Sequence, residues 1–146
     1  MPEKETIKRA RKAKRQGKAA STQAGEFVHA EIDKIRHGEH GARSPEQAIA
    51  IGLSEARRAG VDLPPPKKGK VKESTRKGAE RDLEVGRGER KPQHRTRVSR
   101  AVTKTLQKEP RSTVSKEALS QHAKRAAAKR KRSGPVGSTS KKSQDA

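Results

Sequence analysis

The apolar side chains of this chain are concentrated in one stretch, residues 21–63. This stretch, STQAGEFVHAEIDKIRHGEHGARSPEQAIAIGLSEARRAGVDL, contains the only Phe of the protein and every isoleucine except Ile7. It consists of two amphipathic segments joined by the glycine-rich turn HGEHGARS. Folding must offset roughly 1–2 kcal/mol of backbone entropy per residue, and this stretch carries the apolar surface to do so. We predict a helical hairpin over residues 21–63.

The first helix of the hairpin is predicted from its apolar spacing. Val28, Ile32 and Ile35 recur at i, i+4 and i+7, which places them on one helical face. Ser21 or Thr22 is the expected N-cap. The helix should end at about residue 36, shortly before a glycine that can take the left-handed position beyond a helix end.

The second helix has the clearest start signal in the chain. Ser44 is a natural N-cap, Pro45 suits the first helical position, and Gln47 completes a capping box. Gly52 costs about 1 kcal/mol relative to Ala inside a helix, so we expect a neighbouring helix to approach closely there. Gly60 marks the end of the helix.

The rest of the chain is too polar to predict a second core. Hydrophobic residues make up 27% and charged residues 38% of the protein, a composition typical of disorder. We therefore expect a mainly α-helical protein: a short helical hairpin plus basic helices, with a disordered linker and a disordered C-terminal tail. The expected parts are a basic arm (1–20), the hairpin (21–63), a Pro/Gly/Lys-rich linker (64–95), a pair of basic helices (96–132) and the tail (133–146). The linker has room for one short helix at 74–85.

Positive charge is distributed unevenly over these parts. The net charge is +21, of which residues 1–21 carry +6 and residues 64–146 carry +17, whereas residues 22–63 carry −2. A charge of this size indicates a polyanionic partner. The segment that folds best is the one segment that is not basic, so most of the binding surface should lie outside it.

The candidate phosphate-binding residues come from three basic clusters. Each cation that neutralises a phosphate releases condensed counterions, so affinity needs no base contacts and falls steeply with salt. The third cluster, Arg57 and Arg58, belongs to an alternative in which the hairpin is a helix-turn-helix and residues 44–59 its recognition helix. The candidates are Lys8, Arg9, Arg11, Lys12, Lys14, Arg15, Lys18, Arg57, Arg58, Lys124, Arg125, Lys129, Arg130, Lys131 and Arg132.

The scarcity of aromatic residues suggests which class of polyanion the chain binds. The chain has no Tyr and no Trp, and Phe27 is expected in the core, so it lacks the rings on which single-stranded bases stack. We therefore expect low-specificity binding to the backbone of duplex DNA, as in a nucleoid-associated protein. Structured RNA or the ribosome is the first alternative. A protein-interaction adaptor built on the hairpin, which could also form a homodimer, is the second.

Other classes of function have little support. Cysteine is absent, which excludes disulfides and thiolate sites, and no motif for catalysis is found, so we expect a protein that is not an enzyme and needs no cofactor. His29, His37, His40 and Glu39 are weak evidence for a metal, and we expect none. No apolar run reaches membrane-spanning length, and we expect neither a membrane partner nor export, but a cytoplasmic location on the nucleoid.

The segment HGEHGARSPEQAIAIGLSEARRAGVDLPPPKKG (37–69) resembles a family of small, highly basic bacterial proteins of unknown function, often labelled DNA-binding. The preceding STQAGEFVHAEIDKIR and the later EPRSTVSKEALSQHAKRAAAKR are also similar to that family. The resemblance implies a bacterial cytoplasmic protein associated with nucleic acid. It supplies no catalytic residues.

Overall fold

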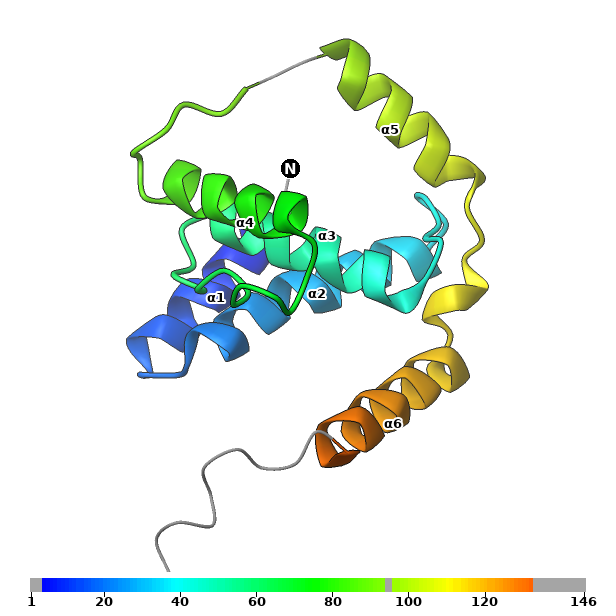
Figure 1. The fold of residues 1–146 in the computed structure, drawn as a ribbon. Coiled ribbons are helices and arrows are strands. Elements are labelled where there is room, and N and C mark those ends of the chain that lie inside the picture. The colour runs from blue at the N-terminus through cyan, green and yellow to red at the C-terminus, as the bar shows by residue number, and fades with distance from the viewer. Residues whose placement is uncertain (1–3, 94–95, 133–146) are drawn as a thin grey trace, which may run out of the picture.

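The computed structural model describes residues 4–93 and 96–132 of the chain. These residues form six α-helices and one 3-10 turn (Figure 1). The mainly α-helical fold predicted from the sequence is confirmed. In chain order, the elements are α1 (Lys4–Arg15), α2 (Ala20–Arg36), α3 (Pro45–Arg58), α4 (Glu73–Gly86), α5 (Thr96–Lys108), η1 (Ser112–Val114) and α6 (Lys116–Arg132).

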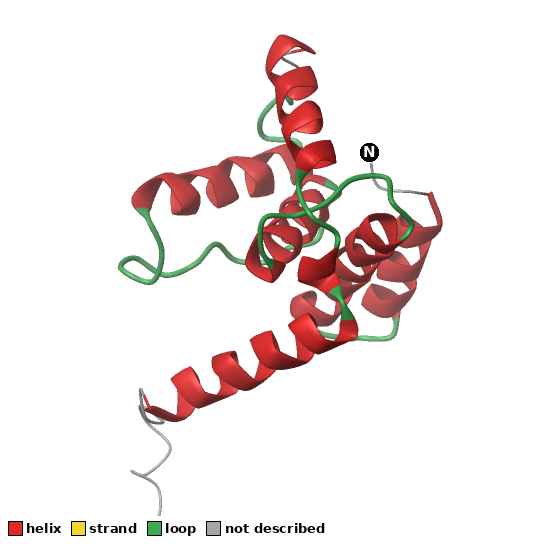
Figure 2. Ribbon diagram, turned by 90° about the vertical axis from the view of Figure 1, so that its right-hand side faces the viewer, coloured by secondary structure: helices red, strands yellow, loops and turns green. Residues whose placement is uncertain are grey.

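The first four helices pack in the order in which they occur. α1 packs on α2, α2 on α3, and α3 on α4. The hairpin of α2 and α3 therefore lies in the middle of the bundle, with α1 on one side and α4 on the other (Figures 1 and 2). α6 contacts α3 and the η1 turn, whereas α5 contacts no other described helix.

The start of α3 follows the predicted cap chemistry. The Ser44 hydroxyl accepts a hydrogen bond from the Gln47 N–H at 3.2 Å, and Pro45 occupies the first helical position. The Gln47 side chain accepts from the N–H of Arg43 at 2.6 Å, one residue earlier than in the usual capping box. The N-cap predicted for α2 is wrong: the helix begins at Ala20 after Ala19, without a side-chain cap.

The close approach expected at Gly52 is confirmed. A Cβ atom on Gly52 would lie 2.6 Å from the Cα and 2.9 Å from the N of Val28. α2 and α3 therefore meet backbone to backbone at this point. Such contact is open only to glycine, which explains why a poor helix former occupies the middle of α3.

Two small cores lie at different ends of the α2–α3 hairpin. The first, which we call the α1 core, consists of Ala10, Ala24, Phe27, Ala56 and Val61. The second, which we call the Val114 core, consists of Ile35, Ala42, Ala48 and Val114. Phe27 and Ile35 are eight residues apart on α2, so the cores are separated by about 12 Å along the helix at 1.5 Å per residue.

Residues 1–20 do not form a loose arm over their described part. α1 buries Thr6, Ala10 and Ala13, which recur at i, i+4 and i+7 and form a flat face of small side chains. This face packs on α2, and Ile7 packs against the α1 core. Small side chains allow two helices to approach closely, so a face with little apolar bulk still attaches the helix.

Residues 64–95 contain more structure than a linker. α4 occupies positions 73–86 and buries Ala79 and Leu83. The sequence left room for a short helix at this place. The Ser54 hydroxyl donates a hydrogen bond to Asp82 at 2.5 Å, which ties α3 to α4. The short helix allowed for at 74–85 is therefore present, but its packing on α3 was not predicted, because two buried side chains give only a weak periodic signal.

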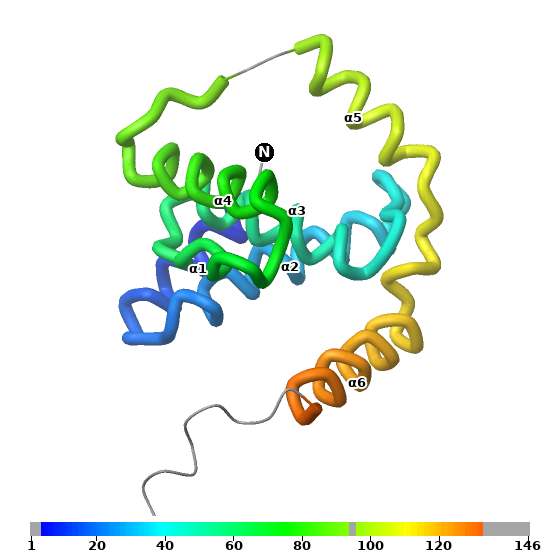
Figure 3. Tube along the Cα trace, in the orientation of Figure 1, coloured from blue at the N-terminus to red at the C-terminus, as the bar shows by residue number. Residues whose placement is uncertain are grey.

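Two basic helices lie within residues 96–132, as expected. α5 and α6 are both present, but they do not pack on each other. α6 begins at Lys116, with the Ser115 hydroxyl accepting from the Ala118 N–H at 3.2 Å, and Ser112 lies in the η1 turn. Figure 3 shows the chain after α5 returning past the turn between α2 and α3 before α6 begins. The tail predicted at 133–146 lies outside the described residues.

Candidate nucleic-acid interface

α1 presents a basic face to solvent. Every Lys and Arg of this helix is exposed, because Thr6, Ala10 and Ala13 form the side that packs on α2. None of these cations forms an ion pair with a described residue. The predicted site residues that the structure brings together here are Lys8, Arg9, Arg11, Lys12, Lys14 and Arg15, with Lys18 exposed just beyond the helix end.

α6 carries the second group of predicted residues. The helix buries no side chain, and its described cations beyond residue 123 are all exposed. They extend away from the bundle in the second half of the helix (Figures 1 and 2). These residues are Lys124, Arg125, Lys129, Arg130, Lys131 and Arg132.

The position of α6 is determined by the segment just before it. Val114 is fully buried in the Val114 core. Its carbonyl accepts a hydrogen bond from Arg36 Nε at 3.1 Å, and the Thr113 hydroxyl donates to the carbonyl of Ala42 at 2.8 Å. Further along, His122 Nδ1 lies 3.0 Å from Glu46 Oε1 at the start of α3. The start of α6 is therefore attached to the hairpin at several points.

The turn between α2 and α3 forms the other half of this attachment. The N–H of Gly41 donates to the Leu106 carbonyl at 2.8 Å, and the N–H of Ala42 donates to the Pro110 carbonyl at 2.9 Å. A Cβ atom on Gly41 would collide with the carbonyl of Glu109. The glycine-rich turn thus accommodates the chain that leads from α5 to α6.

The turn is also held by the half-buried His40, which contacts the buried Glu31 of α2. His40 Nε2 lies 2.6 Å from Glu31 Oε1, and His40 Nδ1 lies 2.8 Å from the Gly41 carbonyl oxygen. Since a carbonyl oxygen only accepts, the contact with Gly41 places the donor on Nδ1. The contact fixes the ring against the turn. Among the described residues no cluster of His, Asp and Glu is arranged to hold a metal ion.

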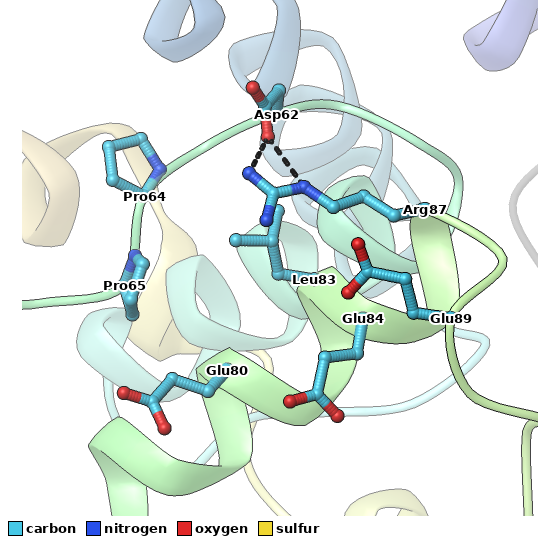
Figure 4. Close-up of a pocket in the computed structure, with 8 residues that line it drawn as sticks. All are labelled: Asp62, Pro64, Pro65, Glu80, Leu83, Glu84, Arg87 and Glu89. Atoms are coloured by element: carbon cyan, nitrogen blue, oxygen red, sulfur yellow. Dashed lines mark hydrogen bonds and ion pairs between the residues drawn. The ribbon is translucent and has the colours of Figure 1, made fainter.

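The α4 side of the bundle is close to neutral, because residues 73–90 carry five Lys and Arg against five acids. Three of its arginines are paired: Arg58 with Asp82 at 3.8 Å, Arg90 with Glu84 at 2.7 Å, and Arg76 with Glu73 and Glu80. Lys77 and Arg81 are exposed and make no ion pair with a described residue. A pocket of about 400 Å³ on this side is lined by four carboxylates, and its one guanidinium is bound to a carboxylate (Figure 4). The contact joins Arg87 Nη2 to Asp62 Oδ1 at 2.6 Å. Phosphates would be repelled here.

Arg57 is not available to phosphate, and its assignment as a binding residue is wrong. Its side chain is 7% exposed, and it donates from Nε to the Leu63 carbonyl and from Nη2 to the Pro64 carbonyl, both at 3.1 Å. Burial lowers the pKa of Arg57, and Asp82 opposes this shift. Arg57 holds the chain that follows α3 against the helix. Arg58 is exposed but lies beside Asp82.

The helix-turn-helix alternative is not compatible with this packing. α3, its proposed recognition helix, lies between α2 and α4. A recognition helix must offer a basic or polar face to the major groove. The exposed positions of α3 are Glu46, Ala50 and Arg58, an acid, a methyl group and a cation that already lies beside Asp82.

The list of candidates misses one basic helix. α5 carries four exposed cations and no acid, and none of the four makes an ion pair with a described residue. The signal in the sequence was the absence of Asp and Glu over residues 96–108. The residues are Arg97, Arg100, Lys104 and Lys108.

Comparison with known proteins identifies one family. Residues 3–68 match a family described only as a family of unknown function (DUF6496). The matched part contains α1, α2 and α3, and stops before α4. The chain matches no curated protein and no solved structure. The resemblance to an uncharacterised family is supported over these residues, while the DNA-binding label remains an expectation. No described helix is long and apolar enough to cross a membrane.

Proposed function

We propose that this protein is a low-specificity DNA-binding protein of the nucleoid-associated type, which contacts the phosphate backbone through the exposed cations of α1 and α6. The observation that carries the proposal is the distribution of charge pairs. On the α4 side, Arg58, Arg76, Arg87 and Arg90 each pair with a carboxylate. On α1 no cation does so with a described residue, although all are exposed.

A single exposed cation costs little in water, but many like charges on one short helix carry a cost. Like charges on one short helix repel each other, and net charge far from zero destabilises the compact state. A duplex relieves this repulsion and releases condensed counterions. Because both helices offer Lys and Arg without neighbouring aromatic rings, the contacts favour the backbone over the bases, and we expect little sequence preference.

The proposal is tested by mobility shifts of the full chain on unrelated duplexes over a salt series. The variant Lys8→Gln/Lys12→Gln/Arg15→Gln removes three cations at i, i+4 and i+7, on the side of α1 away from its buried residues. Each lost phosphate contact lowers the slope of log affinity against log salt by about 0.9, so we expect a decrease of about 2.7.

The matched control removes the same charge elsewhere. Lys67→Gln/Lys68→Gln/Lys70→Gln changes three exposed cations in the segment between α3 and α4, and its slope should stay close to that of the unmodified protein. An equal loss in both variants would show that only total charge matters and would refute the assignment to α1. Competition with structured RNA at fixed salt decides the alternative: preferential release of the duplex by RNA would favour an RNA- or ribosome-associated role.

A further inference from the structure

α1 and α6 are held by different cores of the same hairpin. α1 is attached through the α1 core, which uses the first half of α2 and the end of α3. α6 follows directly from the Val114 core, which uses the end of α2 and the start of α3. Since α2 and α3 form a hairpin, these cores lie at different ends of it. The two basic helices are therefore anchored at separate places.

The surface between the two helices is not basic. Residues 22–63, which form the hairpin, carry five Lys and Arg against seven acids. One of those five, Arg57, is buried, and another, Arg58, lies 3.8 Å from Asp82. The charge of α1 is thus separated from the charge of α6 by a neutral-to-acidic body. A continuous basic groove, which would guide one duplex from α1 to α6, is not formed by the described residues of this body.

The basic part of α6 projects from the bundle beyond its hydrogen bond to the hairpin. His122 of α6 contacts Glu46 of the hairpin at 3.0 Å, and the basic cluster of α6 begins two residues later. Seen after a 90° turn, the second half of α6 extends toward one side of the bundle while α1 lies on the other (Figure 2). Each helix can therefore approach a polyanion from its own direction.

We propose that one molecule bridges two duplex segments, one bound to α1 and the other to the second half of α6. This inference rests on the proposed function and adds to it the number and arrangement of the partners. A monomer suffices, because the two contacts belong to one chain. The Val114 anchor matters for this role, because it keeps the start of α6 against the hairpin and holds the two surfaces apart.

The test is a capture experiment with the full chain. One duplex is fixed to beads, a second labelled duplex of unrelated sequence is added, and the label retained by a limiting amount of protein is measured. The α1 variant is Lys8→Gln/Lys12→Gln/Arg15→Gln, and the α6 variant is Lys124→Gln/Arg125→Gln/Lys131→Gln. The control is Lys67→Gln/Lys68→Gln/Lys70→Gln. All three lose the same charge.

We expect the unmodified protein and the control to retain the label. Each helix variant should still shift a single duplex at low salt, because the other helix remains, but its capture should fall about tenfold or more, as expected for three lost phosphate contacts. Mixing the two variants should not restore capture, because no single molecule then has both surfaces. Circular dichroism of each variant verifies that its helices are retained.

Three results would overturn bridging by a monomer. Retained capture by either helix variant would mean that one surface is enough, as in a dimer with one contact per copy. Restored capture on mixing would likewise point to association between copies. If the unmodified protein shifts a duplex but captures no second one, bridging is refuted while the proposed function stands. If it shifts no duplex, the proposed function itself fails.

Discussion

Replacing Gly52 by Ala should destabilise the bundle, although Ala is normally the better helix residue. The new Cβ would lie 2.6 Å from the Cα and 2.9 Å from the N of Val28. These are backbone atoms, so they cannot rotate away, and α2 and α3 would have to separate. Overpacking of this kind costs about 1–3 kcal/mol, against a gain of about 1 kcal/mol in helix propensity. Separating two backbones should cost about 3 kcal/mol, the top of the overpacking range. After the propensity gain is subtracted, we expect a net loss of about 2 kcal/mol.

The matched control is Gly25→Ala, which places the same methyl group inside α2. A Cβ on Gly25 meets no atom within 4 Å, so only the propensity gain of about 1 kcal/mol remains. The bundle spans α1 to α4, and for a unit of this size 1 kcal/mol corresponds to about 4–8 °C in Tm. We therefore expect Gly25→Ala to raise Tm and Gly52→Ala to lower it by about twice as much.

Thermal unfolding followed by far-UV circular dichroism suits this comparison, because the chain has no Trp and no Tyr to report by fluorescence. Opposite signs for the two variants would support the packing described above. A Tm for Gly52→Ala equal to or above that of the unmodified protein would refute the backbone contact between α2 and α3, and with it the arrangement of the two cores.

Three further predictions concern single side chains. Val114→Ala removes the two γ-methyl groups of a fully buried side chain and should cost about 2 kcal/mol. The loss should be seen as faster hydrogen exchange in residues 106–132 while α1 to α3 stay protected, and unchanged exchange there would contradict the anchor. Burial, with Glu31 nearby, raises the pKa of Glu55 above 4.5, so the ionised form destabilises the fold. Glu55→Gln should therefore raise Tm at pH 7, and this advantage should shrink as the pH falls and vanish below about 4.5; a pH-independent difference would exclude the charge as its cause. Arg57→Ala leaves the two carbonyls that Arg57 contacts without this donor and should lower the free energy of unfolding by about 1–3 kcal/mol. The salt slope of duplex binding should not change, and a lowered slope would show that Arg57 belongs to the binding surface.

The features that the sequence predicted well depend on neighbouring residues. The start of α3 follows from Ser44, Pro45 and Gln47, which lie within four positions of each other. Gly52 was informative for the same reason: a glycine inside a strong helical pattern needs a local cause, and close helix contact is the usual one. The exposed cations of α1 and α6 follow from the cost of burying unpaired charge.

The features that were missed depend on contacts between distant parts of the chain. Val114 is the single buried residue of its segment, and its partners lie about seventy positions away, so no periodicity marks it. Arg57 and Arg58 are adjacent and chemically identical. They differ only because the chain after α3 folds back over one of them, at Leu63 and Pro64. The packing of α1 was missed because its inner face consists of Thr and Ala, whose apolar surface is small.

The small inner face of α1 also explains how so basic a helix belongs to a folded bundle. A larger apolar face would need a wider part of the helix circumference and would bring Lys or Arg stems into the contact. Thr6, Ala10 and Ala13 need only a narrow face, so every cation of the helix stays in water, where an unpaired charge costs little. The acidic excess of the hairpin further lowers the repulsion that α1 meets. The same arrangement leaves the full charge of α1 exposed to a polyanion, so that the packing which stabilises the bundle also creates the surface to which we assign the function.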